Sequence, residues 1–258
     1  TSPIIIYVYT TLTVVALYGN YMLIVMGVQT LMTAMFNSMN AGIGNLVAEG
    51  DKRKIMSVFA ELFSIRFLFS CIMCFGVLMI TPAFVSFWIG KKYVMDSLSL
   101  LLMTAILFVN LSRTTVDAYI NAYGLFGDIW APIVEASLNV GLSIILGYYF
   151  GLHGVLSGVL ISLLLVVFCW KPYYLFRKGL DERLSIYIFM YARHLMAALL
   201  CGVIVCLGMR YSMVQGDTTF FDGLLGILVF SILSTLTLLC VAPGMRNLMR
   251  RFIRMCHV

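Results

Sequence analysis

The pattern of hydrophobic and polar positions divides the chain into eight apolar stretches separated by short polar ones. Most of them approach or exceed the roughly 20 residues that a helix needs to cross a hydrocarbon core. They are also longer than the alternating segments of about ten residues that are typical of a membrane β-barrel. We therefore predict an all-α fold, a polytopic bundle of about eight transmembrane helices. The expected spans are residues 2–11 (a partial span), 14–47, 58–80, 97–118, 129–148, 154–170, 186–209 and 224–241.

The composition agrees with a membrane protein and excludes a water-soluble globule. Hydrophobic residues make up 62% of the 258 residues and charged residues only 11%, and the mean hydropathy is +1.02. The net charge of +6 could suggest a nucleic-acid partner, but the basic residues fall in short loops rather than on one basic face. We expect no nucleic acid. Because the chain begins at Thr1 inside an apolar stretch, we expect it to be a fragment of a longer protein.

Basic residues concentrate in alternate loops and predict the orientation. The segments EGDKRK (49–54), KPYYLFRKGLDER (171–183) and the tail RNLMRRFIRMCHV (246–258) fall on one side if eight spans alternate. Only Lys91, Lys92 and Arg210 fall on the other side. By the positive-inside rule the first group is cytoplasmic, and the C-terminus with it. The basic, amphipathic tail is typical of a helix that lies on an anionic membrane surface.

Polar side chains recur at three- and four-residue intervals in three of the expected spans. Residues at this spacing share one face of a helix, so each set predicts a polar ridge. The three ridges are Gln29, Thr33, Asn37 and Asn40; Asn110, Arg113, Asp117 and Asn121; and Asp128, Glu135, Asn139 and Ser143. Arg66 adds a further charge near the start of the span 58–80.

These charges need compensation, because an uncompensated ionic side chain at a helix centre costs roughly 2.5 to 3.5 kcal/mol in a bilayer. One hypothesis is that the ridges line a water-accessible cavity. Arg113 would then bind a phosphate or pyrophosphate group, and Glu135 or Asp117 would titrate a proton or coordinate a cation. The alternative is structural: Arg113 and Asp117 neutralise each other, Glu135 finds a local partner, the amides only join helices, and Arg66 extends to the interface.

The sequence offers little for catalysis. His153, His194 and His257 are interpreted as interface or loop residues, and Cys71 and Cys74 as packing residues inside an apolar helix. There is no GxSxG elbow and no Walker loop, so we expect a protein that is not an enzyme and that holds no metal or cofactor. Two pairs of glycines at GxxxG spacing indicate close helix packing: Gly147 with Gly151, and Gly154 with Gly158.

Several motifs resemble those of one family of bacterial transporters. The run NAYGLFGDIWAPIVEASLNVGLSIILGYYFGLHGVLSGVLIS (121–162) contains A-x-G-L-F, E-A-x-x-N, S-x-x-L and G-x-x-G-V-x-x-G in that order. Further matches are ALYGNYMLI (16–24), NLVAEGDKRK (45–54) and FWIGKKYV (87–94). Together they resemble the polysaccharide flippases of O-antigen and capsule type, Wzx-like members of the MOP superfamily and distant relatives of MATE exporters. The resemblance covers nearly the whole chain and rests on the shared order of the motifs.

The resemblance implies a two-lobed transporter whose central cavity opens alternately to either side. Residues 1–180 would be the C-terminal six-helix lobe with a partial first helix, and 181–258 the peripheral helix pair with its basic cytoplasmic tail. The N-terminal lobe of the same chain would be missing. Such a protein moves an undecaprenyl-diphosphate-linked oligosaccharide across the bacterial cytoplasmic (inner) membrane for lipopolysaccharide or capsule assembly. The implied partners are this lipid-linked oligosaccharide, membrane lipids, and the polysaccharide polymerase and glycosyltransferases.

By position, the resemblance places Arg113, Asp117, Glu135 and Asn139 at the cavity. The expected substrate-binding set is completed by Asn37, Asn40 and Arg66. Coupling to protons or sodium stays open, as does uncoupled transport. Two alternatives are a small-molecule or drug exporter of MATE type and a membrane-embedded transferase acting on the same lipid carrier. The transferase would need a catalytic histidine or a paired-carboxylate loop at the membrane surface, which the sequence does not show.

Overall fold

The computed structural model describes residues 2–213 and 220–256, and within them every regular element is helical. This confirms the all-α prediction. Three short segments have other helical geometry, namely the 3-10 turn η1 (Lys91–Tyr93) and the π-helical segments η2 (Leu164–Trp170) and η3 (Phe176–Leu180). The α-helices are α1 (Ser2–Tyr9), α2 (Leu12–Glu49), α3 (Lys52–Trp88), α4 (Ser97–Ser112), α5 (Thr114–Ala122), α6 (Trp130–Leu163), α7 (Lys171–Leu175), α8 (Leu184–Met213), α9 (Phe220–Val241) and α10 (Pro243–Cys256).

Six helical segments of the described chain are long and apolar enough to cross a membrane, as expected of a multi-pass membrane protein. The first expected span is only the eight-residue helix α1. The expected spans 129–148 and 154–170 belong to one helical segment that continues to Leu180 and reverses at Gly151. The count of about eight spans stays a prediction. The six segments are Leu12–Glu49, Lys52–Trp88, Ser97–Ala122, Trp130–Leu180, Leu184–Met209 and Phe221–Val241.

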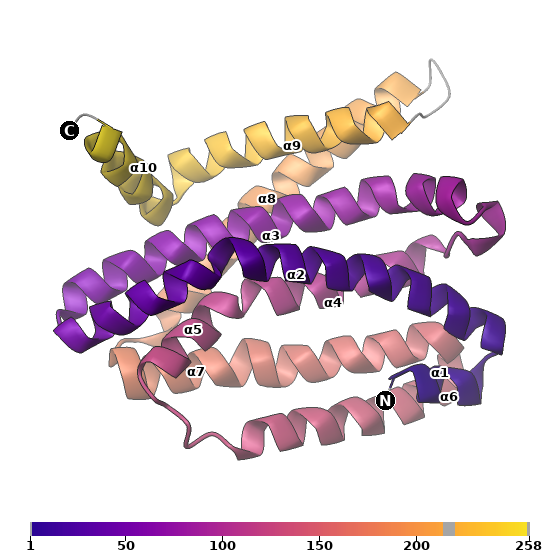
Figure 1. The fold of residues 1–258 in the computed structure, drawn as a ribbon, viewed down its shortest axis with the longest axis horizontal. Helices are drawn as coiled ribbons and strands as arrows, with labels where there is room; N and C mark the ends of the chain where they lie inside the picture. The colour runs from indigo at the N-terminus through magenta and orange to yellow at the C-terminus, as the bar shows by residue number, and fades with distance from the viewer. Residues whose placement is uncertain (1, 214–219, 257–258) are drawn as a thin grey trace.

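The reversal inside α6 explains the glycine pairs. Gly151 has φ 56° and ψ −130°, and the segments before and after it pack against each other as a hairpin (Figure 1). Ser143 Oγ donates a hydrogen bond to the Val155 carbonyl at 3.3 Å across the two arms. A Cβ on Gly154 would lie 1.9 Å from the Leu146 carbonyl oxygen, and one on Gly158 would lie 2.6 Å from the Ser143 nitrogen. The prediction of close packing at these glycines is confirmed.

The expected spans 58–80 and 154–170, which stop before Pro82 and Pro172, are longer in the structure. Helix α3 runs through Pro82 to Trp88, inside the motif FWIGKKYV, and stops before Gly90, which has φ 104°. The helix that contains Pro172 continues to Leu180 because this proline follows the π-helical segment η2. Wider π turns change the hydrogen-bonding register, and a proline lacking an N–H fits where the i−4 register is already interrupted.

The basic loops gather at one end of the bundle, where Figure 1 places the α2–α3 turn, the start of α8 and α10. Lys52, which opens α3 behind the N-cap Asp51, joins Asp181 at 3.0 Å between Nζ and Oδ2. At the opposite end, the Nε2 of His153 lies 2.8 Å from the Asp96 Oδ2. The basic loops therefore lie together at one end of the bundle, as predicted. That the basic end faces the cytoplasm stays a prediction.

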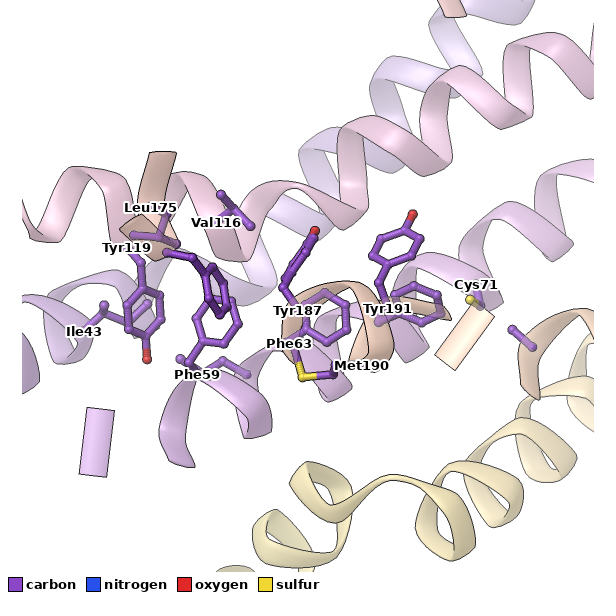
Figure 2. Packing of buried hydrophobic residues seen from close by; sticks show 14 of the residues in the cluster. Ile43, Phe59, Phe63, Cys71, Val116, Tyr119, Leu175, Tyr187, Met190 and Tyr191 are labelled. Carbon is purple, nitrogen blue, oxygen red and sulfur yellow. The ribbon is translucent and has the colours of Figure 1, made fainter. Parts of the chain in front are cut away.

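The core is an aromatic cluster built on α3. Phe59, Phe63 and Phe67 follow one face of α3 and meet the rings of α5, η3 and α8, including those of Tyr119 and Tyr191 (Figure 2). Because α8 contributes directly to this cluster, α3 and α8 are held together by the same packed side chains. The division of the chain at residues 180 and 181 stays a prediction.

His194 corrects one interpretation made from the sequence. Instead of lying at an interface, its side chain is fully buried between the rings of Phe63 and Phe67. Its Nδ1 lies 2.7 Å from the Met190 carbonyl and its Nε2 lies 2.9 Å from Ser64 Oγ. This histidine therefore links α8 to α3. His153 lies in the hairpin turn, as expected, and His257 lies outside the described residues.

Candidate functional site

Two of the predicted polar ridges meet around one cavity of about 390 Å³. One ridge follows α2 and the other follows α4 and α5, while α3 supplies Arg66. Five of the seven residues expected at the substrate site line this cavity. Its polar lining residues are Gln29, Thr33, Asn37, Asn40, Arg66, Asn110, Arg113, Thr114, Asp117 and Asn121.

Arg66 forms the fixed floor of this cavity. Its side chain is only 2% exposed, which excludes the interpretation that it extends to the membrane interface. Nη1 donates to the Thr114 carbonyl at 3.0 Å and Nη2 donates to Asn40 Oδ1 at 3.1 Å. The guanidinium also lies over the ring of Phe36, 5.3 Å from its centroid. Its Nε is buried and has no hydrogen-bond partner among the described residues.

The amides of α2 hold Arg66 in this position. Asn40 Nδ2 donates to Asn37 Oδ1 at 3.3 Å, so the Asn40 side chain is oriented with its oxygen toward Arg66. Such a chain of hydrogen bonds restricts the guanidinium in a low-dielectric surrounding, where a misplaced charge is costly. The two asparagines therefore line the cavity and also hold the Arg66 side chain in place.

The fourth expected span is interrupted at Arg113, where α4 ends and α5 begins. Hydroxyls on either side compete for main-chain carbonyls: Ser112 Oγ donates to Val109 O at 3.2 Å and Thr114 Oγ1 donates to Leu111 O at 2.8 Å. The Thr114 carbonyl is the group that Arg66 binds. The interruption thus lies at the cavity, where irregular backbone in a membrane protein is tolerated.

Asp117 is shared by two cations. Its Oδ2 lies 3.4 Å from Arg113 Nε, one helical turn away, and its Oδ1 accepts a hydrogen bond from Lys171 Nζ at 2.8 Å. The side chains of Arg113 and Asp117 are about 30% exposed, so water reaches them. The predicted ion pair between Arg113 and Asp117 is present. Asp117 also pairs with Lys171 of α7, which lies closer to the carboxylate than Arg113 does.

The charges at this cavity do not balance. Among the lining residues, Arg66 and Arg113 are positively charged and Asp117 is negatively charged. Lys171, which is not a lining residue, contacts Asp117 and adds a third cation beside the cavity. Within the described residues, no ion pair joins Arg66 to a carboxylate. A partly water-accessible cavity with this surplus of positive charge favours an anion.

Glu135 and Asn139 are not among the residues that line this cavity. Their ridge continues to Ser143, whose hydroxyl bonds the returning arm of the α6 hairpin at Val155. Asn139 Oδ1 lies 3.4 Å from the same hydroxyl. This face of α6 is therefore turned toward the second arm of the hairpin. The sequence predicted the turn between the two arms, but not which face of the first arm packs against the second. The local ion-pair partner suggested for Glu135 is not found among the described residues.

Lys171 is the residue that sequence reasoning missed. It was interpreted as a topology signal before a proline, since a basic residue at a span end is ordinary. The helix continues past it, so Lys171 lies against α5 rather than in a loop. Because one arginine and one aspartate in the fourth span balance each other, there was no reason in the sequence to expect a third charge at Asp117 from Lys171, 54 residues further along the chain.

The described residues contain no group of three His, Cys, Asp or Glu side chains that could hold a metal ion. Cys71 and Cys74 are buried in α3 with their thiols free, in agreement with packing residues. Comparison of the chain with protein-family models, with curated proteins and with solved structures finds no match. The cavity and the sequence motifs are therefore the observations that bear on function.

Proposed function

We propose that this chain forms part of a membrane transporter that moves a lipid-linked oligosaccharide, joined to its lipid through a diphosphate, across the bacterial cytoplasmic membrane. The observation that carries this proposal is the surplus of positive charge at the cavity between α2, α3, α4 and α5, where Arg66 and Arg113 line the wall and Lys171 neutralises Asp117 from beside it. A diphosphate diester carries two negative charges at neutral pH. The motif resemblance to polysaccharide flippases supports the same assignment independently.

The cavity assigns different roles to its charges. Arg66 is held in place by Thr114 and Asn40, so its positive charge is fixed at the cavity and acts on the anion without reorganisation. Arg113 is partly exposed and shares Asp117 with Lys171. When a diphosphate binds, Arg113 turns from the carboxylate to the phosphate, and Lys171 keeps Asp117 neutralised. The bidentate geometry of a guanidinium suits this exchange.

The amides around the arginines suit the sugar part of the substrate. Gln29, Asn37, Asn110 and Asn121 present donors and acceptors along the cavity wall. Hydroxyl-rich ligands exchange hydrogen bonds with water readily, so a polar wall of this kind allows binding and release. Asp117 is the one carboxylate among the residues that line the cavity, and we assign to it any coupling to protons or sodium.

The charge balance disfavours the alternative of an exporter for cationic drugs. A cavity with a surplus of positive charge repels organic cations, which need an excess of carboxylates or aromatic faces. The transferase alternative gains no support from the described cavity, where Asp117 is bound by two cations rather than paired with a second carboxylate. Purified protein that transferred sugar without a second enzyme would favour the transferase.

The proposal is tested in cells whose own gene carries Arg113→Gln. We expect cell-surface polysaccharide to be lost while the level of the protein in the membrane is unchanged. The matched control is Arg53→Gln, which removes an exposed arginine in the first turn of α3 and should leave the polysaccharide intact. Normal polysaccharide in the Arg113→Gln strain would remove the anion-binding role.

A further inference from the structure

A second cavity, of about 480 Å³, lies between the start of α3, α8 and the start of α10. It is at the end of the bundle that carries the basic loops. Apolar side chains form most of its wall and a single cation, Arg193, projects into it; the apolar part includes Met56, Ala60, Ile186 and Phe189. This groove is separate from the cavity proposed to bind the transported substrate, with which it shares no lining residue.

Arg193 lacks the partners that a charged group in such a place normally has. Its Nε is buried without a hydrogen-bond partner among the described residues. Its guanidinium lies 5.8 Å from the centroid of the Phe189 ring. The positive charge of Arg246, which is two residues beyond the groove-lining Gly244 on α10, acts on Arg193. Neither arginine forms an ion pair with a described carboxylate. Two neighbouring cations without an acid between them favour a bound anion.

The apolar side of the groove opens outward. Ile186 and Phe189 are 41% and 69% exposed on the surface of α8, where a membrane helix meets lipid. A small inorganic anion would leave this surface unused. The ligand that fits therefore carries a negative headgroup and apolar chains.

The helix that closes the groove is itself suited to an anionic membrane surface. α10 contains four arginines and no acidic residue. Arg246, Arg250 and Arg254 share its polar face and are exposed, while Phe252 is exposed on the opposite side. Such a helix lies in the plane of the headgroups.

We propose that this groove binds one anionic phospholipid, with the phosphate between Arg193 and Arg246 and an acyl chain along Ile186 and Phe189. Basic pockets between membrane helices at the cytoplasmic side are typical sites for such headgroups. The lipid would join α8 to α10 at the point where their arginines otherwise repel each other. It is a structural lipid, distinct from the transported substrate.

The position of α10 does not depend on this lipid. A Cβ on Gly244 would lie 2.3 Å from the Ala60 carbonyl oxygen, so the start of α10 is pressed against α3. Arg251 Nη1 lies 3.3 Å from Oε2 of Glu61, whose side chain is otherwise almost fully buried. Arg251 therefore fixes the helix, and Arg246 is left for the lipid.

The test is a binding titration of the full-length protein in micelles of a neutral detergent. Fluorescent phosphatidylglycerol and phosphatidylcholine with identical acyl chains are compared. We expect tighter binding of phosphatidylglycerol, and a loss on the order of fivefold for each of Arg193→Gln and Arg246→Gln. The double variant should lose at least about tenfold. Arg250→Gln, on the same helix but outside the groove, should change the affinity less than about twofold.

Equal affinity for the two lipids, or an unchanged phosphatidylglycerol affinity in the double variant, would overturn the proposal. If the double glutamine variant unfolds, Arg193→Lys with Arg246→Lys keeps both charges, and we expect it to retain the preference for phosphatidylglycerol; loss of that preference in a folded lysine variant also counts against the site. Inorganic phosphate should not compete at equal concentration, and efficient competition would indicate a soluble anion instead.

Discussion

Arg66 shows how a single buried charge can be both a structural element and a binding group. It bonds a carbonyl at the α4–α5 interruption and an amide on α2, so three segments depend on its two Nη atoms. Burying a guanidinium is costly unless such partners satisfy it. Its Nε is buried without a partner among the described residues, so the guanidinium is not fully satisfied by the protein.

Replacing Arg66 by Met should destabilise the fold. The Thr114 carbonyl and the Asn40 amide would lose their buried donors, at a cost of about 1 to 3 kcal/mol. Thermal unfolding in detergent measures this as a lowered melting temperature. Arg53→Met is the matched control and should stay within about 0.5 kcal/mol. Equal melting temperatures for the two variants would contradict the role assigned to Arg66.

At the other end of the molecule, Asp96 predicts an acid-dependent loss of stability. Burial alone raises the pKa of this carboxyl, but the hydrogen bonds with His153 and with the Ser99 backbone N–H outweigh burial, and the pKa is lowered from 3.8 to about 2. Because the folded-state pKa is the lower one, the carboxylate stabilises the fold above about pH 4, and this contribution is lost as the pH falls toward 2.

Asp96→Asn isolates that contribution. Asparagine keeps an oxygen for the N-cap of α4 but carries no charge. The unmodified protein should melt at a higher temperature than the variant at neutral pH, and the two curves should converge as the pH falls from about 4 to about 2. A constant difference across this range would show that the charge is not the source of the stabilisation.

Among the elements, the α6 hairpin depends most visibly on the absence of side chains. Gly154 and Gly158 let two main chains approach more closely than any Cβ allows. The hairpin in turn supports α1 and α4, against which it packs. Its second arm then continues through π-helical turns to Lys171, and so brings this cation to Asp117.

Gly154→Ala should therefore disrupt the hairpin, because the new methyl group would lie 1.9 Å from the Leu146 carbonyl oxygen. Overpacking of this kind costs about 1 to 3 kcal/mol or more. Gly141→Ala is the control on the other arm of the same hairpin, since nothing lies within 4 Å of its Cβ position. The first variant should melt at a clearly lower temperature and the second should not. Similar effects of both substitutions would contradict the close-packing account.

The sequence was sufficient for features that follow from helical periodicity. The spacing of Asn37 and Asn40 on one helix and of Arg113 and Asp117 on another predicted two polar faces, and these faces meet at the cavity. It was insufficient where the result depends on partners distant in the chain. Whether a proline ends a helix, and whether Glu135 faces a cavity or its own hairpin, is decided by packing that periodicity does not encode.

For the whole molecule, the arrangement separates three electrostatic regions. The substrate cavity carries surplus positive charge, the groove under α10 carries two unpaired arginines, and the opposite end carries the Asp96–His153 pair. The two basic regions share no lining residue, so loss of the lipid site should lower stability or activity without abolishing substrate binding. We propose substrate binding for the cavity between α2, α3, α4 and α5 alone.

That claim is tested most directly by the affinity of the purified full-length protein for a polyprenyl-diphosphate-linked oligosaccharide and for its monophosphate analogue. The account predicts tighter binding of the diphosphate, and a loss of about tenfold or more in Arg113→Gln, because a charge-assisted hydrogen bond contributes about 1.5 to 3 kcal/mol. The affinity for the monophosphate analogue should fall less in this variant. Equal affinity of the unmodified protein for the two lipids, or an Arg113→Gln protein that binds the diphosphate normally, would contradict it.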